Sequence, residues 1–151
     1  MMTDPDPLSI FLTVAPGLEP LLRAEAVERG FDVAEVAPGG VTLRGGWPEV
    51  WRANLVLRGA GRVLVRLAAF RAAHLAQLDK RARRVDWGAV LRPDVAVRVE
   101  ATCRKSRIYH AGAAAQRVAR AVADGLGAPI SDDAPIRLLI RIEDDLCAIS
   151  V

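Results

Sequence analysis

The first half of the chain alternates between short apolar runs and segments with helically spaced apolar positions. The expected strands lie at residues 8–14 (LSIFLTV), 32–36, 41–44 and 62–70 (RVLVRLAAF), and the expected helices lie at residues 18–29 and 48–58. Gly30 stands where a helix C-terminal cap belongs, and Pro48 stands at a first helical position, where proline is well tolerated. The order strand–helix–strand–strand–helix–strand predicts a ferredoxin-like βαββαβ domain over residues 1–70.

The second half has the order helix–strand–helix–strand–strand. Its segments are an expected helix at residues 72–84 with an irregular extension to residue 91, a strand at 94–102, a helix at 109–126, and strands at 136–142 and 146–151. A turn of Glu143, Asp144 and Asp145 separates the last two strands. The predicted fold class is therefore α+β, with mixed sheets, helices packed on them, and a second domain over residues 71–151. Because the sequence stops inside a strand-like run, we expect a domain cut near Val151.

Positive charge is concentrated in the middle of the chain. The net charge is only +3, but residues 62–120 hold 14 of the 21 basic residues and only 4 of the 18 acidic ones. Nineteen of the 21 basic residues are arginine, which a composition bias explains, but such a bias does not explain why they are in the middle. A central basic block of this kind indicates a polyanionic partner.

No feature of the sequence indicates a secreted, membrane or metal-binding protein. The first residues carry Asp4 and Asp6 but no Lys or Arg, and no apolar stretch approaches the roughly 20 residues of a bilayer span. Cys103 and Cys147 lack the spacing of a disulfide scaffold or a metal site, so we expect two reduced thiols in a cytoplasmic protein. No glycine-rich loop has the setting that nucleotide cofactors require. We therefore expect no metal, no cofactor and no catalytic residues in this chain.

The expected helix at residues 72–84 separates apolar residues from basic ones. At about 100° per residue, one side of this helix holds Leu75, Leu78, Ala82 and Val85. The opposite side holds Lys80, Arg81, Arg83 and Arg84. A face that is merely solvated usually mixes both signs of charge, so we favour nucleic-acid contact over plain solvation.

A second basic cluster, RKSRIYH at residues 104–110, joins an expected strand to an expected helix. Helix N-termini suit phosphate, and Ser106 could donate a hydrogen bond there or cap the helix. Tyr109 offers a ring for base stacking, although ordinary packing at a helix start is an equally good interpretation. The expected RNA-binding residues are Lys80, Arg81, Arg83, Arg84, Arg104, Lys105, Ser106, Arg107, Tyr109, His110, Arg117 and Arg120.

The residues at 104–110, followed by Gly112 and QRVA at 116–119, resemble the THUMP-containing, S-adenosylmethionine-dependent RNA guanine-N2-methyltransferases. Four further segments are similar to the N-terminal region of that family: TVAPGLE at 13–19, WRANL at 51–55 with Arg58, RVL at 62–64, and DLCAISV at 145–151. The resemblance covers essentially the whole chain in the expected order.

This resemblance implies a ferredoxin-like domain followed by a THUMP domain that binds structured RNA. It also implies a separate methyltransferase domain that binds S-adenosylmethionine, which is absent from this chain and is expected after Val151. The bacterial 23S rRNA methyltransferases are the most similar members, so rRNA is favoured over tRNA as the target. The expected partners are thus structured RNA and the chain's own catalytic domain, with neither membrane nor DNA.

Two other functions remain open at this point. Ferredoxin-like domains often serve as regulatory or dimerisation modules without binding RNA. A small hydrolase on this scaffold could use Arg23 or Arg52 together with Asn54, but no loop in the sequence presents clustered backbone donors beside those residues.

Overall fold

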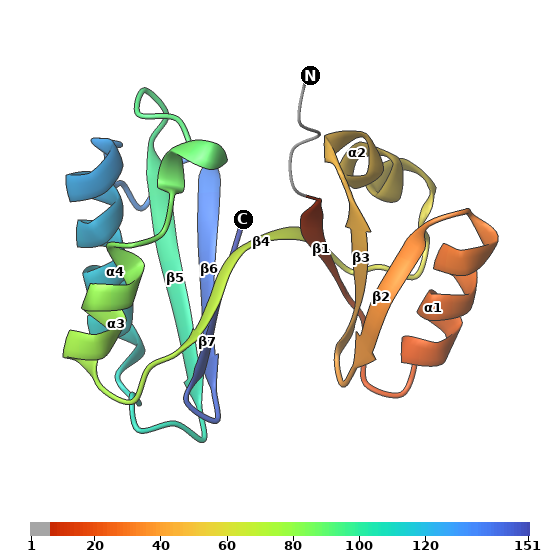
Figure 1. Cartoon of the computed structure of the whole chain (residues 1–151), viewed down its shortest axis with the longest axis horizontal. Helices are drawn as coiled ribbons and strands as arrows, with labels where there is room; N and C mark the ends of the chain where they lie inside the picture. The colour runs from red at the N-terminus through yellow and green to blue at the C-terminus, as the bar shows by residue number, and fades with distance from the viewer. Residues whose placement is uncertain (1–6) are drawn as a thin grey trace. The chain divides into compact units, whose positions relative to one another are not determined.

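Each half of the sequence holds enough apolar residues for a core of its own, and the structure is divided accordingly. It is a computed structural model that describes residues 7–151. The contacts divide the chain into two units, one ending at Arg66 and one running from Leu67 to Val151 (Figure 1). This division falls near the boundary predicted at residue 70, which stays a prediction.

The first unit has four antiparallel strands and two helices. Along the chain these are β1 (Leu8–Thr13), α1 (Glu19–Glu28), β2 (Asp32–Ala37), β3 (Gly40–Gly45), α2 (Trp47–Val56) and β4 (Val63–Arg71), whose last residues belong to the second unit. The strand order is β2-β3-β1-β4, and each neighbouring pair is antiparallel. This is the ferredoxin-like βαββαβ arrangement, so the predicted fold of this half is confirmed.

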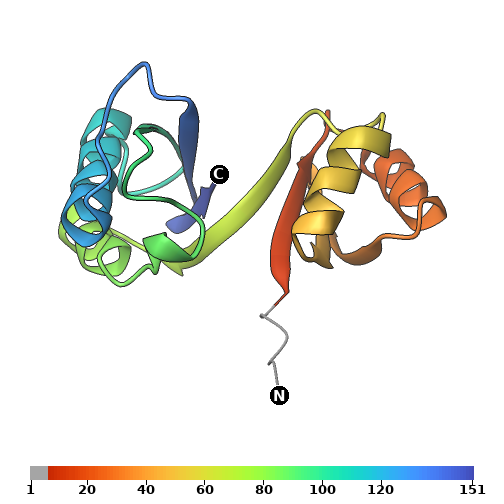
Figure 2. The same ribbon diagram turned by 90° about the horizontal axis from the view of Figure 1, so that it is seen from above.

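Strand β1 lies at the centre of the first unit's core. Ile10 is fully buried and pairs with Leu43 of β3 on one side and with Val65 of β4 on the other. Alternate residues of a strand point to the same face, so these three side chains lie on one face of the sheet. Both helices cover that face (Figure 2), with buried residues Leu22 and Ala26 of α1 and Val50 and Ala53 of α2.

The second unit has the predicted order α-β-α-β-β. Its elements are α3 (Leu75–Ala82), a 3₁₀ turn η1 (Trp87–Ala89), β5 (Val97–Arg104), α4 (Ala111–Leu126), β6 (Ile136–Glu143) and β7 (Leu146–Ser150). Strand β6 pairs parallel with β5 and antiparallel with β7, and the end of β4 lies beside β7. The sheet is therefore mixed, and the predicted α+β class is confirmed.

Helices α3 and α4 cover one face of the second unit's sheet (Figure 1). Leu138, Ile140 and Ile142 of β6 are buried against them, whereas Arg137 and Arg141 alternate onto the other face. Four small residues of α4 are buried at this contact: Ala114, Val118, Ala121 and Val122. Helix α4 ends at Gly127, whose φ of 77° is the left-handed cap conformation that glycine adopts without strain.

Three of the expected elements start two or three residues later than predicted. Helix α3 starts only after His74, which caps it, and ends before Arg83, so the extension to residue 91 is replaced by the separate turn η1 that buries Trp87. Strand β5 begins at Val97 because the residues before it form a turn, where Arg92 bonds the side chain of Asp94. Helix α4 starts at Ala111, two residues late, because His110 caps it.

Candidate nucleic-acid interface

Helices α3 and α4 both begin beside residues 104–110, which we call the basic loop. The Nδ1 of His74 accepts a hydrogen bond from the Gln77 N–H at 3.3 Å, and the Nδ1 of His110 accepts one from the Ala113 N–H at 3.0 Å. The two histidines of the chain therefore cap two helix N-termini. Because Nδ1 is the acceptor in each ring, the ring hydrogen is on Nε2, which is a donor.

A pocket of about 300 Å³ lies at these two helix starts. It is lined by Ala73, His74, Leu75, Arg107, Ile108, Tyr109 and His110. The unpaired N–H groups and aligned peptide dipoles of two first turns make its surroundings electropositive. Ile108 is buried and anchors the loop, whereas Tyr109 is 84% exposed. The Tyr109 side chain therefore does not pack into the core, and its ring is accessible to a base.

Two arginines of the basic loop lie beside carboxylates. The Arg104 Nε is 4.0 Å from the Glu143 Oε1, and the Arg107 Nε is 3.8 Å from the Asp145 Oδ2. Both arginine side chains are largely exposed, at 69% and 78%. Exposed ion pairs of this length contribute little and are screened by salt, so a phosphate can compete for both guanidinium groups.

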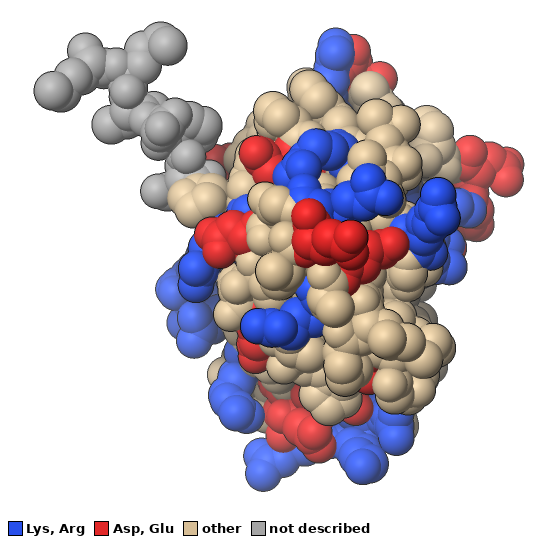
Figure 3. All heavy atoms as spheres, turned by 90° about the vertical axis from the view of Figure 1, so that its right-hand side faces the viewer, with Lys and Arg blue, Asp and Glu red and all other residues tan. Residues whose placement is uncertain are grey.

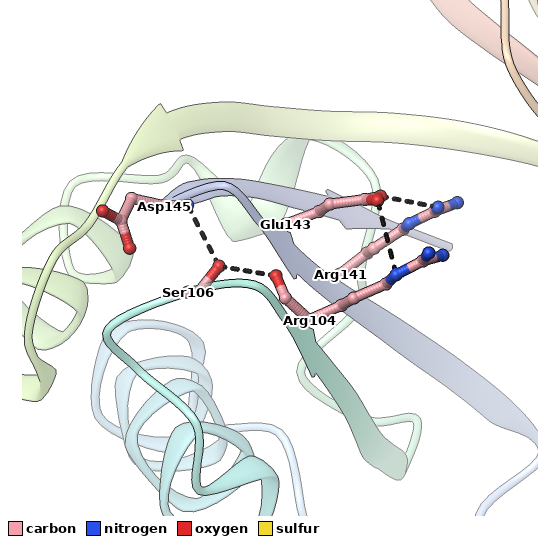
Figure 4. Close-up of polar contacts among 5 residues, drawn as sticks. All are labelled: Arg104, Ser106, Arg141, Glu143 and Asp145. Carbon is pink, nitrogen blue, oxygen red and sulfur yellow. Dashed lines mark hydrogen bonds and ion pairs between the residues drawn. The ribbon is translucent and has the colours of Figure 1, made fainter.

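The other two residues of the basic loop's first half have different roles. Lys105 is exposed, has a φ of 47°, and makes no hydrogen bond or ion pair within residues 7–151. The Ser106 hydroxyl donates to the Arg104 carbonyl at 2.9 Å and accepts from the Asp145 N–H at 3.0 Å (Figure 4). Ser106 therefore stabilises the loop internally. It does not cap α4, because the residue that caps this helix is His110.

The basic residues at the end of α3 form a second group. Lys80, Arg81 and Arg84 are exposed and make no ion pair to any residue that the structure describes. They lie about 10 Å along the helix from its start, given a rise of about 1.5 Å per residue. We call these three residues the α3 basic group, to distinguish them from the basic loop.

Arg83 does not belong to either group. Its Nε is 3.1 Å from the Asp79 Oδ2 and its Nη1 is 2.9 Å from the Asp124 Oδ2, so it joins the ends of α3 and α4. Hydrogen bonds to Asp124 and then to Asp79 raise the pKa of Arg83 above its ordinary value. The expectation that Arg83 offers a free charge on the outer face is therefore wrong, because both of its partners are carboxylates.

The remaining expected contacts lie on α4, after the basic loop. Arg120 is exposed and Arg117 is half-buried. Arg117 follows His110 by about two helical turns and Arg120 by about three, so both extend the basic surface away from the pocket along α4.

Sequence reasoning missed two residues of this region. His74 lines the pocket, and its place directly before the helical apolar pattern of α3 is the signal for a cap. Arg141 bonds the Glu143 Oε2 at 2.7 Å, which places Glu143 between Arg141 and Arg104 (Figure 4). The alternation of β6, which puts Arg137, Arg141 and Glu143 on one face, is the signal for this group.

The face of the first unit that Figure 3 shows carries arginine side chains interspersed with Asp and Glu side chains. Two of the three residues named for a hydrolase make structural contacts. The Arg52 Nη1 donates to the Arg29 carbonyl at 2.7 Å and its guanidinium lies 3.9 Å from the Phe31 ring centroid, while the Asn54 amide donates to the Val50 carbonyl. Nothing in these contacts supports a hydrolytic site.

The two cysteines are free thiols on β5 and β7, the strands that flank β6 in the second unit's sheet. Cys103 and Cys147 both pair with Ile142, from opposite sides, so they are two strands apart, about 9–10 Å, which exceeds the reach of a disulfide. Burial raises the pKa of the Cys147 thiol to about 12 and also raises that of Cys103. Within residues 7–151, no three His, Cys, Asp or Glu side chains are grouped to hold a metal ion. No helix in that range is long and apolar enough to cross a membrane.

The comparisons with known proteins agree with this fold. Residues 9–64 match the family described as the RlmL ferredoxin-like domain. The ribosomal RNA large subunit methyltransferase K/L of Methylococcus capsulatus is 36% identical over 114 residues, which are 76% of this chain and 15% of that protein. The chain thus spans only a small part of this relative. The predicted resemblance to the N-terminal region of RNA methyltransferases is confirmed.

Two solved structures extend the comparison to nearly the whole chain. A predicted N6-adenine-specific DNA methylase from Listeria monocytogenes has a TM-score of 0.87 and 25% identity, covering 95% of this chain and 40% of that one. A 4-thiouridine synthetase, solved as a complex with RNA and ATP, has a TM-score of 0.63 and 10% identity over 95% of this chain and 41% of that one. The second likeness concerns the fold alone.

Proposed function

We propose that this chain, whose residues 9–64 form a ferredoxin-like domain of the RlmL family, is the RNA-recognition part of an RNA methyltransferase. The observation that carries the proposal is the basic loop, which places Arg107, an exposed Tyr109 and the capping His110 around one pocket. The kinship with a ribosomal RNA methyltransferase and the fold shared with a protein solved in complex with RNA support it.

A pocket of this size suits one nucleotide at the end of a structured RNA better than it suits a long segment of RNA. Its volume of about 300 Å³ is at the lower end of the range for small-molecule sites. Tyr109 stacks on a base, and a phosphate lies near the helix starts and Arg107. The group at Lys80, Arg81 and Arg84 then contacts the backbone of the same RNA, because about 10 Å corresponds to about three nucleotides of one strand at roughly 3.4 Å each. These contacts position the RNA without reading its sequence.

The catalytic step belongs to another part of the parent protein. In this proposal S-adenosylmethionine is bound by a methyltransferase domain outside this chain, and that domain modifies a guanine at N2. Ribosomal RNA is favoured over tRNA because the relative from Methylococcus capsulatus is named for large-subunit rRNA. The free thiols of Cys103 and Cys147 fit a reducing compartment, and the cytoplasm is the proposed location.

The test is binding of the chain to an RNA hairpin with a single-stranded 3′ tail, at two salt concentrations. A DNA hairpin of the same sequence and a blunt RNA hairpin are the comparators, and light scattering records the oligomeric state. We expect salt-sensitive binding that is strongest for the tailed RNA. Equal binding of DNA, or a tight dimer that ignores RNA at low salt, would refute the proposal and favour the dimerisation alternative.

A further inference from the structure

The turn between β6 and β7 has an unusual residue for its backbone conformation. Glu143 pairs with Leu146, so Asp144 and Asp145 alone connect the strands, and their φ values are 51° and 62°. Two-residue hairpins with both residues in the left-handed region strongly favour glycine at the second position. Asp145 occupies that position, and its backbone has a left-handed conformation that is unfavourable for any residue with a Cβ.

The Asp145 carboxylate connects this turn to the basic loop. Its Oδ1 accepts a hydrogen bond from the Arg107 N–H at 2.8 Å, across 38 residues of sequence. The backbone of Asp145 adds two contacts, because its N–H donates to the Ser106 hydroxyl and its carbonyl accepts from the Ala72 N–H at 2.9 Å. The turn thus holds both the basic loop and the segment that leads into α3, which are the two sides of the pocket.

The charge of Asp145 is, by itself, unfavourable for an RNA-binding surface. A carboxylate 3.8 Å from the Arg107 guanidinium repels a phosphate that approaches the same group. Its neighbour Asp144 has the same charge and a left-handed backbone, but its side chain makes no hydrogen bond or ion pair within the described part of the chain. The two side chains therefore differ in their contacts to Arg107, because only the Asp145 carboxylate accepts from its N–H and lies beside its guanidinium.

We propose that Asp145 is a positioning residue for RNA binding: its carboxylate fixes the backbone of the basic loop at Arg107, so that the exposed side chains of Arg107 and Tyr109 meet the ligand in one arrangement. This inference rests on the proposed function. It reverses the expectation from charge alone, because removal of this acidic group then weakens the binding of an anion. The carboxylate acts through the loop and does not contact the RNA.

The test compares Asp145→Gly with the matched control Asp144→Gly in the full chain, using a labelled RNA hairpin with a 3′ single-stranded tail. Each substitution removes one negative charge, and each places glycine at a left-handed position of the same turn, where it is not strained. We expect Asp145→Gly to weaken binding roughly ten-fold, the effect of one charge-assisted hydrogen bond at a partly exposed site. Asp144→Gly leaves the affinity unchanged or raises it. Asp145→Asn keeps an oxygen acceptor for the Arg107 N–H and restores wild-type binding.

Amide hydrogen exchange supplies a measurement that does not depend on RNA. The Arg107 amide is protected in the wild type and in Asp145→Asn, and exchanges faster in Asp145→Gly. If Asp145→Gly binds RNA as tightly as Asp144→Gly, or if the Arg107 amide is unprotected in the wild type, the inference is wrong while the proposed function stands. If the wild-type chain binds no RNA, the proposed function fails and this role of Asp145 fails with it.

Discussion

Replacing Lys105 with glycine removes a cation and at the same time relieves a left-handed backbone conformation. The φ of Lys105 is 47°, a conformation that disfavours a residue with a Cβ by about 1–2 kcal/mol. Glycine loses more conformational freedom on folding, which offsets about 0.5–1 kcal/mol of that gain. We therefore expect Lys105→Gly to stabilise the second unit by about 0.5–1 kcal/mol, which raises its midpoint of thermal unfolding by about 2–8 °C.

The effect of the same substitution on RNA binding has the opposite sign. Lys105 is exposed and unpaired within residues 7–151, so its loss removes one phosphate contact and lowers the slope of log K against log salt by about 0.7–0.9. The control is Lys105→Ala, which loses the same charge but keeps the unfavourable φ, so it weakens binding equally without stabilising the protein. Calorimetry and fluorescence anisotropy measure the two effects. If Lys105→Gly is no more stable than Lys105→Ala, or if both bind like the wild type, this reasoning is refuted.

Two further predictions concern stability. Hydrogen bonds from the N–H groups of Gly59 and, less strongly, Arg58 lower the pKa of Glu25. The charged Glu25 carboxylate therefore stabilises the first unit at neutral pH. This contribution to stability is lost as the pH falls below 4.5, the ordinary pKa of the carboxyl group. In urea unfolding followed by tryptophan fluorescence, Glu25→Gln should be less stable than the wild type at pH 7 and approach the wild-type stability at pH 3. A stability difference between the two proteins that is constant with pH would contradict this. Arg83→Ala should lower the unfolding temperature of the second unit without changing the salt dependence of RNA binding, because Arg83 joins α3 to α4, whereas Arg81→Ala should do the reverse.

Local patterns predicted the elements well where the signal lies within a few residues. Helix α4 follows from its spacing of small apolar residues, and its end follows from Gly127, which takes the left-handed cap. The bond between Arg83 and Asp124 was missed because the two residues are 41 positions apart and no local pattern can reveal such a contact.

The candidate site depends more strongly on long-range contacts. The sequence indicates where basic residues concentrate, but not that Arg104 and Arg107 lie beside Glu143 and Asp145. The pocket arises because two helices start at one place, and this depends on how α3 and α4 pack on the sheet. The interpretation of these basic residues as RNA contacts stays a prediction, while the exposed Tyr109 favours the stacking interpretation over packing.

The most direct test of the account reverses the charge of Arg104 and Arg107 together. In the double variant Arg104→Glu/Arg107→Glu, the slope of log K against log salt for the tailed RNA hairpin should fall by roughly 1.5, as expected when two phosphate contacts are lost. The matched control, Arg23→Glu/Arg62→Glu, changes the net charge equally at two exposed positions of the first unit and should keep the wild-type slope. Equal losses of affinity and slope in both variants would show that RNA responds only to net charge, and would contradict a site at the basic loop.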